Sequence, residues 1–296
     1  PTIFFGFASL TVPFVYAIAA LLWRDYERWV PRVLPYALLS TAALGLGLFM
    51  GGYWAYETLG WHGFWAWDPV ENASFFPWLA VTALVHGLVV QKSRGGMART
   101  NIFLGLLAFN LFMGGTFLTR SGVLAQKDGN GADLSVHAFA NMESTALKIL
   151  VVMLGVYFVG TTLLFVVRVR SIPVRKTVGD SPLSRDLASF IAVLMMILAC
   201  AVVVFGTTTP LFLLWTHKAP WQPDGAFYNK VLLPLALLTA LSLGVVPWLA
   251  WRKTNSQVFL RKLLLPWLLM LLFGFFMVFW VQSAQAGLEA VFDSTD

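Results

Sequence analysis

The residues best suited to chemistry gather in one stretch, Tyr53–Trp78, which reads YWAYETLGWHGFWAWDPVENASFFPW. Ten of its 26 residues are aromatic, it holds five of the 13 tryptophans, and it carries acidic residues but no Lys or Arg. Tryptophan offers a large flat apolar surface with one polar N–H. A segment this rich in tryptophan, with Trp61, Trp65 and Trp67 at its centre, predicts a surface for a large flat ligand. The alternative is the aromatic belt found at membrane interfaces.

The same stretch contains the signature of a helix start. Asp68 fits the N-cap, Pro69 the first helical position and Glu71 the third, which together form a capping box. A capped helix start also presents free N–H groups and the positive end of the helix dipole. Two interpretations therefore stay open for Asp68 and Glu71. They cap the helix only, or the helix start that they form also holds a ligand carboxylate, such as a haem propionate.

One histidine lies deep in an apolar run. His86 follows Asp68 by 18 residues, in TALVHGL, which is about 27 Å of rise on a helix at about 1.5 Å per residue. An ionisable residue inside a membrane span is a functional candidate, and neutral imidazole is a good axial ligand for haem iron. The alternative is a neutral histidine that is hydrogen-bonded to a neighbouring helix.

Two further candidates follow the next apolar run. Arg120, in GTFLTRSGVL, could bind a propionate through two parallel hydrogen bonds or anchor a helix at the interface. His137, in LSVHAF, is either a ligand or an exposed or capping histidine. His217 reads as a surface residue, and His62 lies within the aromatic stretch.

The elements that position these residues follow from composition. The chain has 296 residues, of which 58% are hydrophobic and 11% charged, and its mean hydropathy is +0.75. Soluble domains carry about 25% charged residues, so the surplus of apolar side chains must face lipid. Runs of about 20 apolar residues span a bilayer, and they do so as helices because lipid offers the backbone no hydrogen-bond partner. Eight such runs cover residues 2–23, 33–52, 69–90, 101–119, 146–167, 187–214, 231–250 and 263–282.

These patterns predict an all-α, polytopic membrane helix bundle. We expect one transmembrane domain over residues 1–296, with residues 53–78 as an external tryptophan-rich segment within it. The abrupt start on Pro1, with neither Met nor a charged leader, predicts that the chain is a piece of a longer protein. The single cysteine, Cys200, lies in an apolar run and is expected in the core, so we expect no catalytic thiol. No other residue is assigned a catalytic role.

Basic residues predict the orientation. Of the 20 Lys and Arg residues, 15 fall in loops on one side of the expected spans and 5 on the other. The positive-inside rule makes the richer side cytoplasmic, so the aromatic stretch, Arg120 and His137 face outward. The net charge of +6 is then a topology signal, and we expect membrane lipid rather than nucleic acid around this chain.

Longer stretches resemble a known family. WHGFWAWDPVENASFFPWL closely resembles the tryptophan-rich signature of the WWD family of haem-handling proteins. WDPVENASFFPWL, GTFLTRSGVL and SVHAFA, in that order, are similar to the CcmF haem lyases of bacterial cytochrome c maturation. The resemblance covers most of residues 1–252, and only hydrophobicity agrees beyond residue 262.

The resemblance implies cytochrome c biogenesis at the bacterial cytoplasmic (inner) membrane, with the aromatic stretch on the periplasmic side. The family takes haem from a CcmE-like chaperone and, with CcmH-like subunits, promotes thioether attachment to the CXXCH motif of apocytochrome c. By this resemblance, Trp61, Trp65, Trp67, Asp68, Glu71 and Arg120 form the haem platform and its propionate contacts. His137 becomes an external haem ligand and His86 a ligand of a buried b-type haem. The alternative is a protein that transports or presents haem without chemistry of its own.

Three departures accompany the resemblance. The second external histidine of the family would precede Pro1, and the sequence offers no second ligand for the b-type haem. His62 stands where the family usually has glycine, so no role is carried over to it. The segment AQKDGNGAD before SVHAF resembles an insertion.

Overall fold

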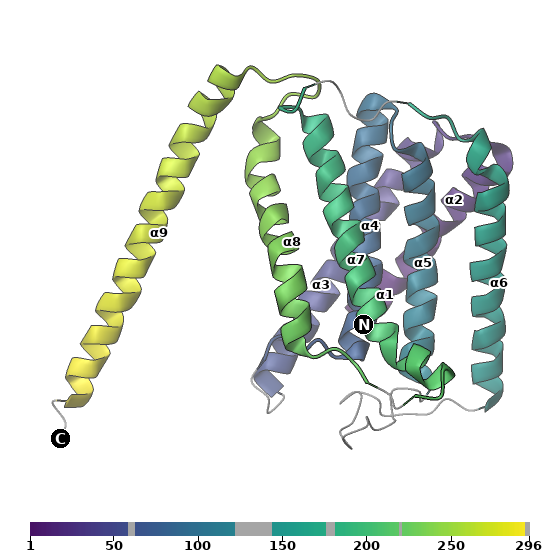
Figure 1. Ribbon diagram of the computed structural model, residues 1–296, viewed down its shortest axis with the longest axis horizontal. Coiled ribbons are helices and arrows are strands. Elements are labelled where there is room, and N and C mark those ends of the chain that lie inside the picture. The colour runs from purple at the N-terminus through teal and green to yellow at the C-terminus, as the bar shows by residue number, and fades with distance from the viewer. Residues whose placement is uncertain (59–62, 122–143, 176–180, 219–220, 294–296) are drawn as a thin grey trace.

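The computed structural model describes residues 1–58, 63–121, 144–175, 181–218 and 221–293. Figure 1 shows α4 to α8 side by side, with α3 crossing behind them and α9 leaning away at one edge. The helices in chain order are α1 (Thr2–Ser9), α2 (Thr11–Trp23), α3 (Trp29–Thr58), α4 (Pro69–Arg94), α5 (Ala98–Arg120), α6 (Ser144–Arg168), α7 (Arg185–Trp215), α8 (Gly225–Val245) and α9 (Ser256–Asp293), with 3-10 turns η2 (Val169–Ser171) and η3 (Val246–Trp248).

All eight spans expected from hydropathy are present as helices long and apolar enough to cross a membrane. The prediction of an all-α, multi-pass membrane protein is therefore confirmed. The structure lengthens the expected helix 33–52, because α3 runs from Trp29 to Thr58. The first residues of the aromatic stretch, Tyr53–Thr58, therefore belong to α3. Neither Gly nor Pro interrupts this segment, so nothing in it ends the helix earlier.

The first span is divided at Leu10 into α1 and α2. Pro13 has no N–H, so the carbonyl of Ser9 lacks its usual partner four residues later. The backbone tightens there, and the N–H of Leu10 donates to the carbonyl of Phe7 at 3.2 Å. The Ser9 hydroxyl donates to Ser40 Oγ of α3 at 2.8 Å, which fastens the break to the next span.

Helix α4 is the centre of the bundle. It packs against α3, α5 and α7, and 67% of its most apolar window is buried, more than in any other span of the described chain. Glycines allow the close approach of α5. A Cβ on Gly115 would lie 2.8 Å from the carbonyl oxygen of Ala73, and one on Gly87 would collide with Asn101. The helix that begins in the aromatic stretch is therefore held on three sides.

Buried amides join neighbouring spans. Asn72 of α4 donates to Thr207 Oγ1 of α7 at 3.1 Å. Asn110 of α5 donates to Thr161 Oγ1 of α6 at 3.1 Å. Such hydrogen bonds fix helix pairs in a membrane, where lipid tails compete for apolar contacts as well as another helix does.

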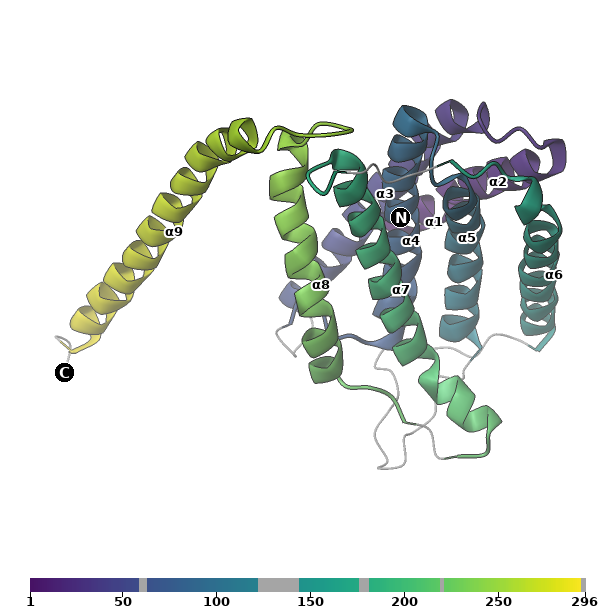
Figure 2. The same ribbon diagram turned by 45° about the horizontal axis from the view of Figure 1, so that its top comes forward.

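The edge helices expose most of their apolar side chains. We compare the most apolar 18 consecutive residues of each span. Of these residues, 11% are buried in α6, 6% in α8 and none in α9. Lipid is the natural environment for such surfaces. Figures 1 and 2 both show α9 separated from α8 along most of its length, so its inclusion in one domain with the bundle stays a prediction.

The two ends of the bundle differ in chemistry. We call the end where α4 and α8 begin the aromatic end, and the opposite end the basic end. At the basic end, Arg94 of α4 pairs with the buried Asp186 of α7 at 3.1 Å, and Arg175 pairs with Glu27 at 2.6 Å. Both ion pairs join segments that are distant in the sequence.

Candidate functional site

Aromatic side chains from the start of α4 converge on one space at the aromatic end. Trp65 lies 5.6 Å from Phe75 between ring centroids, and Phe75 stacks on Trp78 at 5.8 Å. With Asn229 of α8 they line a cavity of about 430 Å³, here named the aromatic cavity. Its full lining is Gly45, Leu48, Phe49, Phe64, Trp65, Trp67, Phe75, Trp78 and Asn229.

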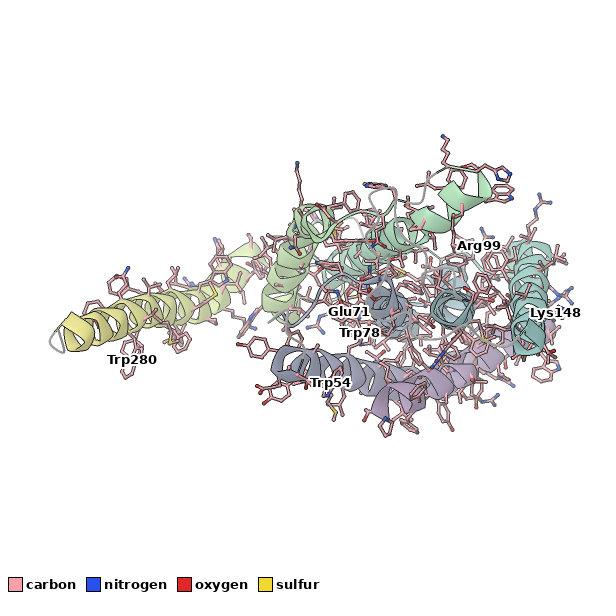
Figure 3. The ribbon with its side chains drawn as sticks, turned by 90° about the horizontal axis from the view of Figure 1, so that it is seen from below. Trp54, Glu71, Trp78, Arg99, Lys148 and Trp280 are labelled. Carbon is pink, nitrogen blue, oxygen red and sulfur yellow. The ribbon has the colours of Figure 1, made fainter. Side chains whose placement is uncertain are left out.

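Aromatic density alone does not define this cavity. Trp54 belongs to the same aromatic stretch, yet it lies on α3 and is 56% exposed. Seen along the bundle in Figure 3, Glu71 and Trp78 lie on the central helix α4, whereas Trp54 lies on α3 at the margin. The stretch therefore supplies both cavity-lining and outward-facing aromatics.

Trp67 is held from three directions. Its indole stacks on Tyr228 of α8 at 5.0 Å and 13°, and its Nε1 donates to Asn229 Oδ1 at 2.8 Å. Its carbonyl accepts from the Asn72 side chain at 3.0 Å. Its φ of +60° lies in the left-handed region, which is uncommon for a bulky residue. The strain is sustained by these contacts, and it turns the chain from the loop into α4.

The capping box predicted from Asp68 and Glu71 is confirmed. Asp68 Oδ2 accepts from the backbone N–H of Val70 at 2.8 Å. Glu71 Oε2 accepts from the N–H of Ala66 at 2.9 Å and from that of Asp68 at 3.4 Å. These carboxylates hold the backbone that carries Trp65 and Trp67. A direct contact between either carboxylate and a ligand stays a prediction.

One indole N–H in the aromatic cavity remains available to a ligand. Trp65 Nε1 is buried and has no hydrogen-bond partner among the residues that the structure describes. Trp78 Nε1, in contrast, donates to the carbonyl of Thr41 in α3 at 3.0 Å. A buried donor without an acceptor costs about 1–3 kcal/mol, so an acceptor on a bound ligand would be stabilising at Trp65.

A second cavity continues from the first toward the membrane interior. It has about 440 Å³, lies between α4, α7 and α8, and shares Trp67, Phe75, Trp78 and Asn229 with the aromatic cavity. Apart from Asn229, its polar residues are Thr82 and Thr239. Three of its lining residues also border a third cavity, which is lined by His86. These shared residues are Met196, Thr239 and Leu243.

His86 faces α7 and η3 through two connected spaces. A small one of about 110 Å³ includes Met196 and Ser189, and a larger one of about 400 Å³ includes Arg185. His86 Nδ1 bonds the carbonyl of Thr82 at 2.9 Å. A carbonyl only accepts, so Nδ1 is the donor in this hydrogen bond, and in a neutral imidazole Nε2 then keeps its lone pair. The structure thus provides the tautomer that an axial ligand for haem iron requires.

The alternative role expected for His86, a hydrogen bond to a neighbouring helix, finds no support in the described part of the chain. The hydrogen bond to Thr82 lies within α4 itself. Residues 69–94 form a continuous helix, so this bond follows from the i, i−4 spacing alone.

Arg120 lies apart from the tryptophans. It ends α5 and borders a separate cavity of about 490 Å³ between α1, α4 and α5, with Phe4, Ser74 and Thr119. The α4 residues that line this cavity are Val70, Ala73 and Ser74, on a different side of the helix from Phe75 and Trp78. The described residues thus do not unite Arg120 with Trp65 and Trp67.

Three candidates lie outside the described residues. These are Trp61, His62 and His137. His217 lies just beyond the end of α7, has a left-handed φ of +55° and is exposed. Among the described residues, no group of three or more His, Cys, Asp or Glu side chains could hold a metal ion, and Cys200 is free and buried.

Tyr228 and Asn229 were missed in the sequence. They open α8 in AFYNKVLLPL, where the local signal is a polar pair at the start of an apolar run. Their role depends on contact with Trp67, which is more than 160 positions earlier.

Comparisons with known proteins identify similar chains. A family model described as Cytochrome C assembly protein matches residues 1–124. The chain is 38% identical over 266 residues to the cytochrome c-type biogenesis protein CycK of Bradyrhizobium diazoefficiens, covering 89% of this chain and 38% of CycK. It is 36% identical over 281 residues to the cytochrome c-type biogenesis protein CcmF of Escherichia coli, covering 90% of this chain and 42% of that protein.

A solved structure agrees with these relatives. The structure of cytochrome c haem lyase CcmF matches with a TM-score of 0.65 at 34% identity, over 86% of this chain and 36% of the other. The chain thus spans about two fifths of the length of the curated relatives it matches.

Proposed function

Because this chain belongs to the CcmF/CycK family of cytochrome c-type biogenesis proteins, we propose that it is the haem-binding membrane part of a cytochrome c haem lyase. The observation that carries the proposal is the aromatic cavity, in which Trp65, Trp67 and Trp78 line one space of about 430 Å³. Sites for small molecules typically measure about 300–1,000 Å³ and combine an apolar lining with a few polar groups.

The aromatic cavity suits haem as a substrate. Indole and phenyl rings stack on or meet the edge of a flat conjugated ring with favourable geometry. Trp67 is already fixed by Tyr228 and Asn229, so little side-chain freedom is lost on binding. Trp65 Nε1 is a free buried donor in the described part of the site. The cavity is therefore preorganised for a flat, largely apolar ligand.

The reaction proposed is the addition of two thiols to the two haem vinyl groups. In each addition an S–H bond and the vinyl double bond are lost, and a C–S bond and a C–H bond form. The thiols belong to a CXXCH segment of apocytochrome c, and Cys200 of this chain is buried. The share of this chain is to hold the ring in place and exclude water. His137 is proposed as an external ligand to the iron.

His86 is proposed to hold a resident b-type haem. Its Nδ1 is hydrogen-bonded to the Thr82 carbonyl, and its side chain lines the cavities between α4, α7 and η3. When bound, this group would supply one-electron chemistry to the substrate haem. The chain supplies the ligand nitrogen, its fixed tautomer, and an apolar surrounding of Met196, Leu243 and Val246.

The orientation and partners follow the same proposal. The aromatic end faces the periplasm of a bacterial cytoplasmic membrane, because 15 of the 20 basic residues belong to the opposite side. A CcmE-like chaperone would deliver haem to the aromatic end, and CcmH-like subunits would present apocytochrome c there.

Covalent attachment of haem tests the proposal. The full-length protein is produced with its maturation partners and a CXXCH-containing apocytochrome c, and thioether-bound haem is measured by haem staining after denaturation. The double variant Trp65→Ala/Trp67→Ala is expected to lose attached haem. Trp54→Ala, an exposed tryptophan outside the cavity, is the control and should retain it.

Equal yields in both variants would contradict the role of the aromatic cavity. The competing function, presentation or transport of haem without chemistry, makes a different prediction. It would be favoured if the double variant lost attachment but regained it when haem was supplied directly at the periplasmic side.

A further inference from the structure

The cavity beside His86 at the basic end is also lined by a cationic side chain, Arg185, which has no role in the proposed function so far. This cavity of about 400 Å³ is lined by His86, Val85 and Val89 of α4, Arg185 and Ser189 of α7, Val246 and Pro247 of η3, and Trp251. It shares His86, Ser189, Val246 and Pro247 with the smaller cavity beside the imidazole. A ligand bound at His86 would therefore have Arg185 within the same connected space.

Arg185 is fixed by its surroundings. It begins α7 directly after Ser184, whose side chain accepts from the N–H of Leu187 at 3.3 Å. Its own N–H donates to the carbonyl of Ala250 at 2.8 Å. Its Nη2 donates to the carbonyl of Pro247 at 2.9 Å, and its guanidinium lies 5.3 Å from the Trp251 ring centroid. The planar fork is thus oriented before any ligand arrives.

The guanidinium lacks an acidic partner. In the described part of the chain, Arg185 forms no ion pair, and its Nε is buried without a hydrogen-bond partner. The adjacent carboxylate, Asp186, pairs instead with Arg94 at 3.1 Å. A buried, charged donor without an acceptor is costly, and a carboxylate that meets the Arg fork with two parallel hydrogen bonds is its best partner.

The depth of the site agrees with a carboxylate at this end. His86 precedes Lys92 by six residues, which is about 9 Å of helix at about 1.5 Å per residue. A ligand that points its charged groups toward the basic end keeps them near the polar interface, where burying charge costs less than at the bilayer centre. Propionates that pointed from His86 toward the aromatic end would instead enter the cavity that continues from Trp67, which is almost wholly apolar.

We propose that Arg185 binds a propionate of the tetrapyrrole whose iron is held by His86, with the propionate edge directed toward the basic end. The inference rests on the proposed function, and it adds the orientation of the buried haem and the residue that sets its charge environment. Trp251 and Pro247 act as positioning residues, because they hold the guanidinium in place and carry no charge of their own to bind the propionate.

The redox potential of the buried haem tests the proposal. Removing a cation next to a propionate leaves a negative charge that favours ferric over ferrous iron. In the full-length protein, Arg185→Gln should shift the ferric-to-ferrous ratio at a fixed potential at least tenfold toward ferric, which is about 59 mV for one electron. The b-type spectrum should remain, since His86 is unchanged.

Arg175→Gln is the matched control. Arg175 also lies at the basic end, but its side chain is 57% exposed, pairs with Glu27, and is absent from the lining of the His86 cavities. Arg175→Gln should change the ferric-to-ferrous ratio at the same fixed potential by less than about twofold. An Arg185→Gln potential that equals the Arg175→Gln potential would overturn the proposal.

Reconstitution with haem dimethyl ester separates a propionate contact from other anions. The ester has no carboxylates, so the tenfold difference between wild type and Arg185→Gln should vanish with it. A difference that persists with the ester would mean that Arg185 meets another anion, such as a lipid phosphate, and would refute the proposal. If Arg185→Gln fails to accumulate, the wild type decides: at least tenfold weaker binding of the ester supports the contact, and equal binding refutes it.

The outcomes also separate this inference from the proposed function. Loss of the b-type spectrum in His86→Ala together with an unchanged potential in Arg185→Gln would remove only the role of Arg185. A wild-type protein without any b-type spectrum would remove both.

Discussion

The hydrogen bond from Trp67 to Asn229 determines how firmly α8 supports the aromatic cavity. Trp67 Nε1 donates to Asn229 Oδ1 at 2.8 Å. A neutral hydrogen bond contributes about 0.5–1.5 kcal/mol net, and about 1.4 kcal/mol corresponds to a factor of ten in affinity. Asn229→Ala should therefore weaken haem binding at the aromatic cavity about twofold to tenfold.

The strained backbone of Trp67 makes the effect specific. Its φ of +60° belongs to conformations that cost about 1–3 kcal/mol and persist only when the surroundings hold them. Asn229, Tyr228 and Asn72 all contact Trp67. Releasing one of these contacts lowers the fraction of protein in which the indole is ready for a ligand.

The assay is a haem titration of full-length protein in a His86→Ala background, so that only the external site is occupied. Trp67→Phe lacks the indole N–H and completes a double-mutant cycle. Asn229→Ala should weaken binding in the Trp67 protein and have almost no further effect in Trp67→Phe. Asn255→Ala, which removes a side chain that caps α9 instead, is the control.

Two results would refute this reasoning. Strictly additive effects of Asn229→Ala and Trp67→Phe would show that their hydrogen bond does not contribute to binding. An equal loss in Asn255→Ala would show that any change near these helices has the same effect.

Three further predictions concern stability, measured by thermal unfolding in detergent. Gly115→Ala should destabilise by about 1–3 kcal/mol, because its Cβ would lie 2.8 Å from the carbonyl oxygen of Ala73, whereas Gly114→Ala, which meets nothing within 4 Å, should be neutral or slightly stabilising. Asp68→Ala should cost about 0.5–2 kcal/mol through loss of the N-cap, and Asp68→Asn should restore most of it; equal losses would contradict the capping role. Asn72→Ala should cost about 1–3 kcal/mol, because the Trp67 carbonyl loses its side-chain partner; an unchanged midpoint would contradict this.

Local features of the site were accessible from sequence. The capping box needs only Asp68 and Glu71 at their fixed spacing, and the structure confirms both hydrogen-bond sets. The eight spans follow from apolar runs of bilayer length. The tautomer of His86 also has a local cause, because Thr82 is four residues earlier on the same helix.

Long-range features were not accessible. No local pattern indicates that Asn229 accepts from Trp67, since the contact requires the start of α8 to lie beside the segment that precedes α4. The same holds for Arg185, whose cavity is closed by η3 and Trp251, which come 61 to 66 positions later in the chain. The apolar runs predicted the helices that surround both sites, but only packing determines which polar groups line them.

Arg120 and Trp54 show where pattern reasoning is misleading. The resemblance groups Arg120 with the tryptophans as a propionate contact, whereas in the structure it borders a cavity on another side of α4. Trp54 was counted in the aromatic density, yet it is 56% exposed on α3. Membrane depth and residue type were predictable, whereas the direction in which each helix face points depends on the neighbouring helices.

The most direct test of two separate haem sites is the optical spectrum of the full-length protein supplied with haem. We predict that His86→Ala abolishes the b-type band and preserves haem binding at the aromatic cavity, and that Trp65→Ala/Trp67→Ala does the reverse. Loss of both haem populations in either variant, or of neither population in both, would contradict the account.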